Sequence, residues 1–95
     1  MNKYESLYII KSALEEEGRK QLIEKLSEVV RTNGGEVEAV EEWGLKHLAY
    51  PIEKQNDGYY VLMNFSGSST LPEELERNLQ ITDDVLRYIV LRKDK

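Results

Sequence analysis

The alternation of hydrophobic and polar positions along the chain predicts four strands. Short segments rich in β-branched and aromatic residues are typical of strands. They occur at residues 4–10, 37–50, 59–65 and 85–91. Gly44 interrupts the second segment and predicts a β-bulge there. Pro51 cannot donate a hydrogen bond to a sheet, so it either ends this strand or marks it as an edge strand.

Two helices are predicted between the strands. Ser12 and Glu15 have the spacing of a capping box ahead of the first helix. Thr70 and Glu73 repeat that spacing ahead of the second. Both helices have an apolar face for a core, at Leu22, Leu26, Val29 and Val30 and at Leu75 and Leu79. Residues 33–35 (NGG) end the first helix, because glycine adopts a positive φ at low cost.

The order of these elements is strand-helix-strand twice, and it predicts an α+β fold. Residues 53–58 (EKQNDG) are typical of a turn that joins the second and third strands as a hairpin. The order is that of the ferredoxin-like βαββαβ sandwich, a four-stranded antiparallel sheet with two helices on one face. Its first and third strands are central, and its second and fourth are edges. We expect residues 1–95 to form a single domain of this kind.

The strands do not alternate cleanly between apolar and polar positions. A sheet covered by helices on one face should be polar on the other. The third strand instead has Tyr59, Val61, Met63 and Phe65 on one face and Tyr60 and Leu62 on the other. The first strand has Tyr4, Tyr8 and Ile10 opposite Leu7 and Ile9, and the last has Val85, Ile89 and Leu91 opposite Leu86, Tyr88 and Val90. Such a patch usually marks a partner surface; the alternatives are a homodimer that stacks two sheets, and tyrosines that lie flat.

The charge of the chain is acidic overall but segregated. Its 95 residues have a formal net charge of −5, from 18 acidic and 13 basic residues. Phosphate binding depends on positive charge, so this total alone argues against nucleic acid as a partner. Acids are concentrated at residues 15–17, 36–42 and 72–76, and bases recur at Lys3, Lys11, Lys46, Arg87, Arg92 and Lys93. An acidic protein of this kind can still present a basic stripe.

Enzymatic chemistry has few candidate residues. The chain has no cysteine, which excludes disulfides, thiolate nucleophiles and cysteine-ligated metals, and His47 is the only histidine. The acidic runs are typical of solvated surfaces. An acylphosphatase-like enzyme shares the predicted topology, but it needs an arginine-bearing anion loop after the first strand, where this chain has Lys11 and then acids. We therefore expect no catalytic residue, metal, cofactor or small-molecule substrate.

The amino-terminal residues and the overall hydropathy bear on location. The start of the chain lacks the apolar run and the small-residue cleavage site of a signal peptide. No segment approaches the length needed to span a membrane. The expected location is the cytoplasm, with no membrane partner.

The remaining candidate site combines basic and aromatic residues from several strands. Arginine and lysine bind phosphate oxygens, and tyrosine can stack on bases or hydrogen-bond to sugars. The candidate nucleic-acid-binding residues are Lys3, Tyr4, Lys46, His47, Arg87, Arg92 and Lys93. The candidate protein-partner residues are Trp43, Leu48, Tyr50, Tyr60 and Tyr88. Any one of them alone is typical of an ordinary surface side chain, so the prediction depends on the whole set.

A family resemblance covers residues 3–92. It rests on KYESLYII at the start, WGLKHLAYPI after the acidic strand, NDGYYVL, and ITDDVLRYIVL near the end. These segments resemble those of the sixth protein of the bacterial small ribosomal subunit. By position, Lys46 and His47 correspond to the family's basic pair, Tyr50 to its tyrosine, and Arg87 to its last-strand arginine. Neighbouring strand residues point to opposite faces, so Lys46 and His47 would hold a partner from two sides of an edge strand.

The resemblance implies a ferredoxin-like fold and a structural, non-enzymatic role. It implies binding to the central domain of the small-subunit ribosomal RNA together with a basic partner, the eighteenth protein of the subunit. The expected function is therefore that of a structural constituent of the small subunit, located in the ribosome. The alternative from a different class is a homodimeric ferredoxin-like module that binds a small molecule across stacked sheets.

Overall fold

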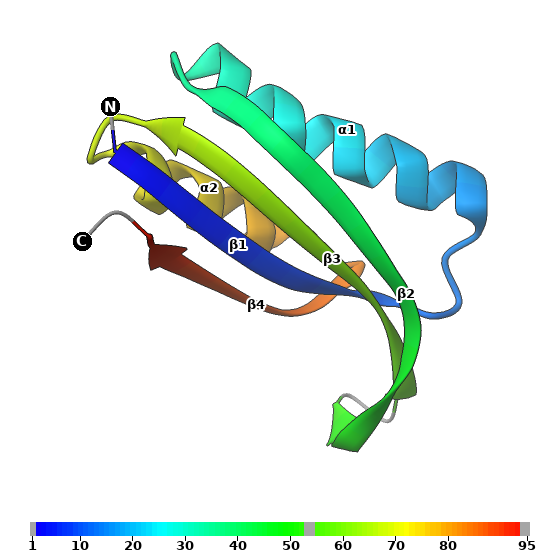
Figure 1. The fold of residues 1–95 in the computed structure, drawn as a ribbon. Helices are drawn as coiled ribbons and strands as arrows, with labels where there is room; N and C mark the ends of the chain where they lie inside the picture. Colours follow the sequence, from blue (N-terminus) through cyan, green and yellow to red (C-terminus); the bar gives the residue numbers. More distant parts are fainter. Residues whose placement is uncertain (1, 53–54, 94–95) are drawn as a thin grey trace.

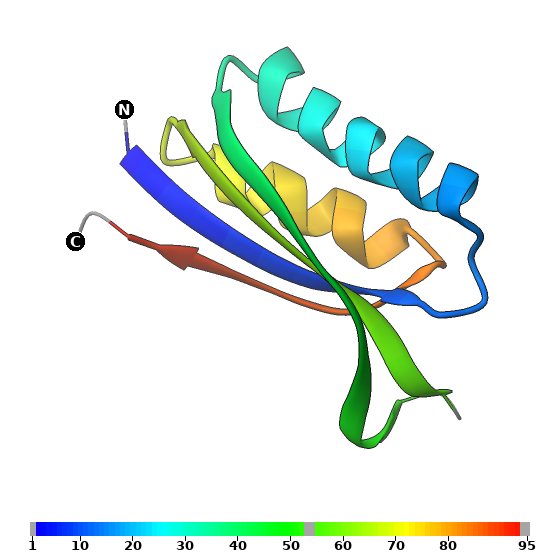
Figure 2. The same ribbon diagram turned by 45° about the vertical axis from the view of Figure 1, so that its right-hand side comes forward.

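The computed structural model describes residues 2–52 and 55–93, which form one four-stranded sheet and two helices. The elements are β1 (Asn2–Lys11), α1 (Glu16–Thr32), β2 (Glu36–Ile52), β3 (Gln55–Gly67), α2 (Leu71–Ile81) and β4 (Val85–Arg92). Neighbouring strands are antiparallel, in the order β2-β3-β1-β4. Both helices lie on one face of the sheet (Figure 1, Figure 2), which confirms the predicted ferredoxin-like sandwich with β2 and β4 at its edges. Neither helix combines the length and the apolar character needed to cross a membrane.

The core lies between the helices and one face of the sheet. Successive strand residues point to opposite faces, and β1 and β3 turn alternate side chains toward the helices. These side chains are fully buried: Tyr8, Ile10, Val61, Met63 and Phe65. The predicted helical faces meet them, with Leu22, Leu26, Val30, Leu75 and Leu79 buried and Val29 packed against the cluster. Each large apolar side chain buried in this way contributes about 1.5–3 kcal/mol relative to an exposed one.

Strands β2 and β3 are longer than predicted. The predicted turn at residues 53–58 is wrong from Gln55 onward, because residues 55–58 lie within β3; residues 53 and 54 lie outside the described residues. Strand β2 continues through Pro51 to Ile52, so the proline does not end it. The other interpretation of Pro51, as the mark of an edge strand, is confirmed. Cross-strand pairing overrides the turn propensity of these residues.

The predicted capping boxes are wrong in their hydrogen bonds. Helix α1 begins at Glu16 with Glu15 as its N-cap and no side-chain cap. The chain after β1 instead makes a turn in which the Leu14 amide donates to the Lys11 carbonyl. Thr70 is the N-cap of α2, as its position predicted, but its hydroxyl lies 3.0 Å from the hydroxyl of Ser68 instead of capping the helix. For α2 the sequence therefore predicts the N-cap position but not the capping hydrogen bond, whereas for α1 the predicted N-cap, Ser12, lies three residues before the observed one, Glu15.

Two glycines shape β2 and its hairpin with β3. Gly44 has a φ of +92°, and the register shifts between Glu42 and Gly44, which confirms the predicted bulge. The hairpin extends beyond the helices and bends (Figure 2). At Gly58 the chain passes so close to a neighbouring strand that an added Cβ would collide with Cγ2 of Ile9 and lie 3.5 Å from Cδ2 of Leu48. Leu48 is only 4% exposed, so the bent hairpin is packed onto β1.

We expect Gly58→Ala to destabilise the protein by about 1–3 kcal/mol, because overpacking a close contact displaces its neighbours. The measurement is the free energy of unfolding in urea. In the double variant with Ile9→Ala the colliding methyl group is gone, so alanine at position 58 should cost much less than it does alone. Equal stability of Gly58→Ala and the parent chain would contradict the close approach.

Candidate nucleic-acid interface

The face of the sheet opposite the helices carries large apolar side chains, and we call it the open face. The strand register places Leu7, Ile9, Tyr60, Leu62, Ile89 and Leu91 on it as neighbours. Ile89 and Leu91 are 49% and 51% exposed. The break in apolar–polar alternation therefore corresponds to a contiguous surface. One part of that prediction is wrong: Val85 pairs with Ile10 on the core side, because a register shift separates it from Ile89 and Leu91.

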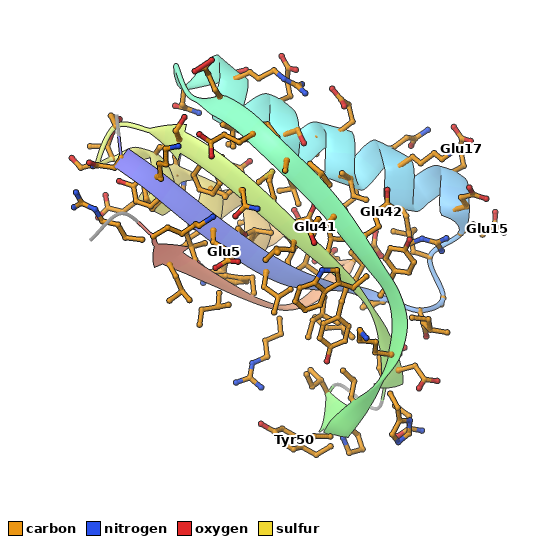
Figure 3. The ribbon with its side chains drawn as sticks, viewed as in Figure 1. Glu5, Glu15, Glu17, Glu41, Glu42 and Tyr50 are labelled. Atoms are coloured by element: carbon orange, nitrogen blue, oxygen red, sulfur yellow. The ribbon has the colours of Figure 1, made fainter. Side chains whose placement is uncertain are left out.

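At one end of the open face, residues from the two edge strands meet. The Arg87 guanidinium of β4 donates a hydrogen bond to the Tyr50 hydroxyl of β2 at 3.2 Å. Two strands separate β2 from β4 in the sheet, so this contact depends on the bend of the β2–β3 hairpin. The hydrogen bond from Arg87 lowers the pKa of Tyr50 and raises the pKa of Arg87 itself. Figure 3 shows Tyr50 on the hairpin, away from the centre of the sheet.

Two shallow hollows lie beside Arg87. One, of about 300 Å³, is lined by Leu7, Ile9, Arg87, Tyr88 and Ile89. The other, of about 110 Å³, is lined by Ile9, Leu48, Ala49, Tyr50, Ile52, Tyr60 and Arg87. Arg87 therefore stands between two apolar depressions. It has no carboxylate partner among the described residues.

Lys46 and His47 point to opposite faces, as adjacent strand residues should. Lys46 pairs in register with Gly58, on the side of the open face, and its ammonium group has no ion pair or hydrogen bond within residues 2–52 and 55–93. His47 pairs with Asp57, and its Nδ1 lies 3.0 Å from Oδ1 of that residue. Lys46 is thus free to bind an anion, whereas His47 already faces a carboxylate that would repel one.

The other candidate bases lie at the far end of the sheet. Lys3 forms an ion pair with Glu38 at 3.5 Å. Lys93 donates to Oδ1 of Asn64 at 3.1 Å, and Arg92 donates to Oδ1 of Asn2 at 2.9 Å. The seven candidate nucleic-acid residues therefore do not form one cluster. Of the seven, only Lys46 and Arg87 lie toward the end of the open face beside the β2–β3 hairpin, which we call the hairpin end, and have no acidic partner in the described chain.

Three candidate residues are buried or turned toward the core. Tyr4 is 4% exposed, stacks on Phe65 with 5.4 Å between ring centroids, and donates its hydroxyl to the Ser68 carbonyl. Its ring offers no surface to a nucleic acid. Leu48 of β2 is buried where the hairpin packs onto β1, and Tyr88 pairs with Tyr8 and packs against the core. Of the candidate partner residues, Trp43 and Tyr50 are the exposed ones, at 46% and 61%.

The sequence-based search missed two acids of the open face. Glu5 pairs in register with Asn64 and Leu91, and Glu41 pairs with Leu62, so both point away from the helices. Figure 3 shows Glu5 and Glu41 over the central part of the sheet. The signal was present in the alternation of β1, where Glu5 shares the face of Leu7.

Another hollow lies elsewhere, between the two helices. It has a volume of about 760 Å³ and is lined by residues such as Lys20, Glu24, Val29 and Asn78. Arg31 already pairs with Glu24 and Glu28, and Arg77 pairs with Glu74. Because its acids are neutralised in this way, this groove carries no strong charge for a ligand.

The protein-family model described as Ribosomal protein S6 matches residues 3–92 of the chain. The chain belongs to the ribosomal protein S6 family. The match spans every strand and both helices, and it confirms the resemblance drawn from the four sequence segments. It also confirms the expected place in the ribosome, in the cytoplasm.

Individual S6 proteins are similar over the whole chain. The Small ribosomal subunit protein bS6 of Alkaliphilus oremlandii is 50% identical over 95 residues, which is 100% of both chains. That of Caldanaerobacter subterraneus subsp. tengcongensis is 49% identical over 94 residues, 99% of each chain. A crystal structure of the 30S ribosomal protein S6 from Thermotoga maritima superposes with a TM-score of 0.92 at 30% identity, over 97% of this chain and 87% of that one.

The contact between Tyr50 and Arg87 gives a titration test in the free protein. A neighbouring cation favours the tyrosinate form, so its loss should raise the pKa of Tyr50 toward the ordinary value of about 10. We therefore expect Arg87→Ala to raise this pKa, as measured by the pH dependence of the Tyr50 Cζ signal in carbon NMR. Arg77→Ala, on helix α2, is the control and should leave the titration unchanged. An unaltered titration in Arg87→Ala would show that the contact does not form in solution.

Proposed function

We propose that this chain binds the central domain of the small-subunit ribosomal RNA together with the eighteenth protein of the subunit. Its role is structural and non-enzymatic. The proposal is supported by membership of the ribosomal protein S6 family, whose curated relatives are named as small ribosomal subunit proteins. The observation that carries the RNA part is the pair of cations at the hairpin end, Lys46 and Arg87, which have no carboxylate partner in the described residues.

The chemistry of the hairpin end suits an RNA backbone. Lysine and arginine are the usual partners of phosphate oxygens. Tyr50 is 61% exposed and already bonded to Arg87, so its ring lies beside a cation where it can meet a sugar or an unstacked base. The same three residues, Lys46, Tyr50 and Arg87, are those that correspond by position to the basic pair, the tyrosine and the last-strand arginine of the resembling family, which supports the proposal.

The need for a basic protein partner follows from charge. The chain has a net charge of −5, and helix α2 has three acids against one base. Affinity for RNA depends on the number of phosphates that cations neutralise, and the hairpin end supplies few. A basic protein that binds both the chain and the RNA would supply the rest. Each component would then favour the binding of the other.

A homodimeric module for a small molecule is less well supported. The hollows of the open face are about 300 and 110 Å³, at or below the lower end of ordinary ligand pockets. Family membership also favours the ribosomal role.

We expect Arg87→Ala to weaken RNA binding and to flatten its dependence on salt. Loss of one phosphate contact should reduce the log–log slope by roughly one unit. The measurement is the affinity of the chain for a central-domain RNA fragment, with the partner present, at several salt concentrations.

Two further variants show whether charge is the cause. Tyr50→Phe removes the hydrogen bond and keeps the guanidinium, so its slope should match that of the parent chain. Arg77→Ala removes a cation of the same type from α2, on the helix side, and should not alter the slope. An Arg87→Ala variant that binds as the parent does at every salt concentration would rule out this phosphate contact.

The partner should strengthen RNA binding by about 5–150-fold, the usual range of coupling between two ligands. The measurement compares the affinity of the chain for the RNA fragment with and without the eighteenth protein, at one fixed salt concentration. Bovine albumin, added at the same concentration in place of the eighteenth protein, is the control for crowding. Equal affinities with and without the partner would mean that Lys46, Arg87 and their neighbours suffice alone.

A further inference from the structure

Three elements meet at the base of the β2–β3 hairpin, on the side of the sheet that faces the helices. Cζ of Arg19, in α1, lies 4.2 Å from the centre of the Tyr59 ring. The Tyr59 hydroxyl, in β3, donates a hydrogen bond of 2.8 Å to Oε1 of Glu42 in β2. Glu42 shares a row of the sheet with Val61 and the core residue Tyr8, so its side chain points toward α1 (Figure 3). We call Arg19, Tyr59 and Glu42 the hairpin latch.

The contacts of the hairpin latch join α1 to both strands of the hairpin. Arg19 also donates from Nη1 to the Leu14 carbonyl at 3.0 Å, and its Nε is buried without a hydrogen-bond partner in the described chain. A guanidinium withdrawn from water interacts more strongly with an aromatic ring than an exposed one does. The hydrogen bond to the Glu42 carboxylate is the main cause of the raised pKa of Tyr59, and it keeps the hydroxyl protonated as a donor.

The hairpin latch lies directly beside the close approach that bends the hairpin. Tyr59 follows Gly58, and adjacent strand residues point to opposite faces. Gly58 is packed against Ile9 on the open face, while Tyr59 is held by α1 on the other. Farther along the same hairpin, the Tyr50 hydroxyl accepts the hydrogen bond from Arg87. The base of the hairpin is therefore held from both faces of the sheet, next to the proposed RNA site.

We propose that the hairpin latch positions the RNA site by holding the hairpin at the angle that brings Tyr50 to Arg87. The consequence for RNA rests on the proposed function, whereas the consequence for Tyr50 does not. The three latch residues lie on the helix side of the sheet, so they act through the hairpin and do not touch the RNA. A hairpin that leaves Arg87 for part of the time lowers the apparent affinity in proportion to the population that is lost.

The first test is made in the free protein and follows the titration of Tyr50 by carbon NMR. Arg19→Met keeps the alkyl stem and removes the cation above the Tyr59 ring. Tyr50 should then lose its contact with Arg87 for part of the time, so its pKa, which that contact lowers, should rise toward about 10 although Arg87 is intact. Arg19→Lys returns a cation to the ring and should restore most of the lowering. Tyr59→Phe, which removes only the hydroxyl, should raise the pKa of Tyr50 by less than Arg19→Met does.

Arg31→Met is the control, because it removes a cation near the other end of α1, where the partners are Glu24 and Glu28. It should leave the Tyr50 titration unchanged. The free energy of unfolding in urea is measured for every variant. A latch residue with a purely structural role would lower this stability without moving the pKa of Tyr50. An unchanged Tyr50 titration in Arg19→Met would therefore overturn the positioning role.

The second test is the affinity for the central-domain RNA fragment at several salt concentrations, with the protein partner present. Arg19→Met retains Lys46 and Arg87, so the bound complex makes the same phosphate contacts and the salt slope should match that of the parent chain. If the hairpin is in place for about a tenth of the time, the affinity falls about tenfold at each concentration. A slope reduced by about one unit would mean that Arg19 itself contacts a phosphate, which would overturn the positioning role.

The same measurement separates this inference from the proposed function. Parent-like affinity of Arg19→Met beside weakened binding by Arg87→Ala would overturn the hairpin latch alone. Parent-like binding by Arg87→Ala at every salt concentration would instead overturn the RNA site, while the Tyr50 titration would still show whether the hairpin latch holds the hairpin.

Discussion

The packing of alternate side chains of β1 and β3 against two helices is the interaction on which the rest of the structure depends. It fixes the register of the central strands, because a slip by one residue would move Tyr8 and Met63 out of the core. It also fixes what remains outside. Two helices cover one face only, so every second residue of the same strands is presented on the open face. The core and the candidate interface are thus two consequences of one alternation.

The close approach at Gly58 adds the second constraint. A strand that carried a side chain there could not lie so near Ile9, and Leu48 could not pack over it. The resulting bend brings Tyr50 of edge strand β2 into contact with Arg87 of edge strand β4. In a flat sheet the two strands that lie between β2 and β4 would keep these residues apart. The hairpin end is therefore a structure built from both edges. Its cations are assembled by packing, although they are distant along the chain.

The sequence predicted the parts of this arrangement that depend on periodicity. Element order, edge strands, the Gly44 bulge and the buried helix positions all follow from local pattern, and all are confirmed. Its errors about the candidate site concern pairing between distant segments. Tyr4 looked like a surface aromatic beside Lys3, but stacking on Phe65 makes it core. Lys3 was predicted to bind nucleic acid, but it forms an ion pair with Glu38 of β2. The pairing of strands that brings these two residues together cannot be inferred from the local sequence of either.

The open face also has an energetic meaning for a protein of this size. A chain of about 100 residues buries only a modest fraction of its surface, so apolar side chains left outside the core are a cost in solubility. Ile89 and Leu91 are about half exposed in the free chain, so roughly half of their possible hydrophobic stabilisation is still available. Folding of the chain does not provide this remaining stabilisation, because no element of the described chain covers the open face of the sheet. These side chains gain that stabilisation only when another molecule covers them, and binding and final burial are then the same step.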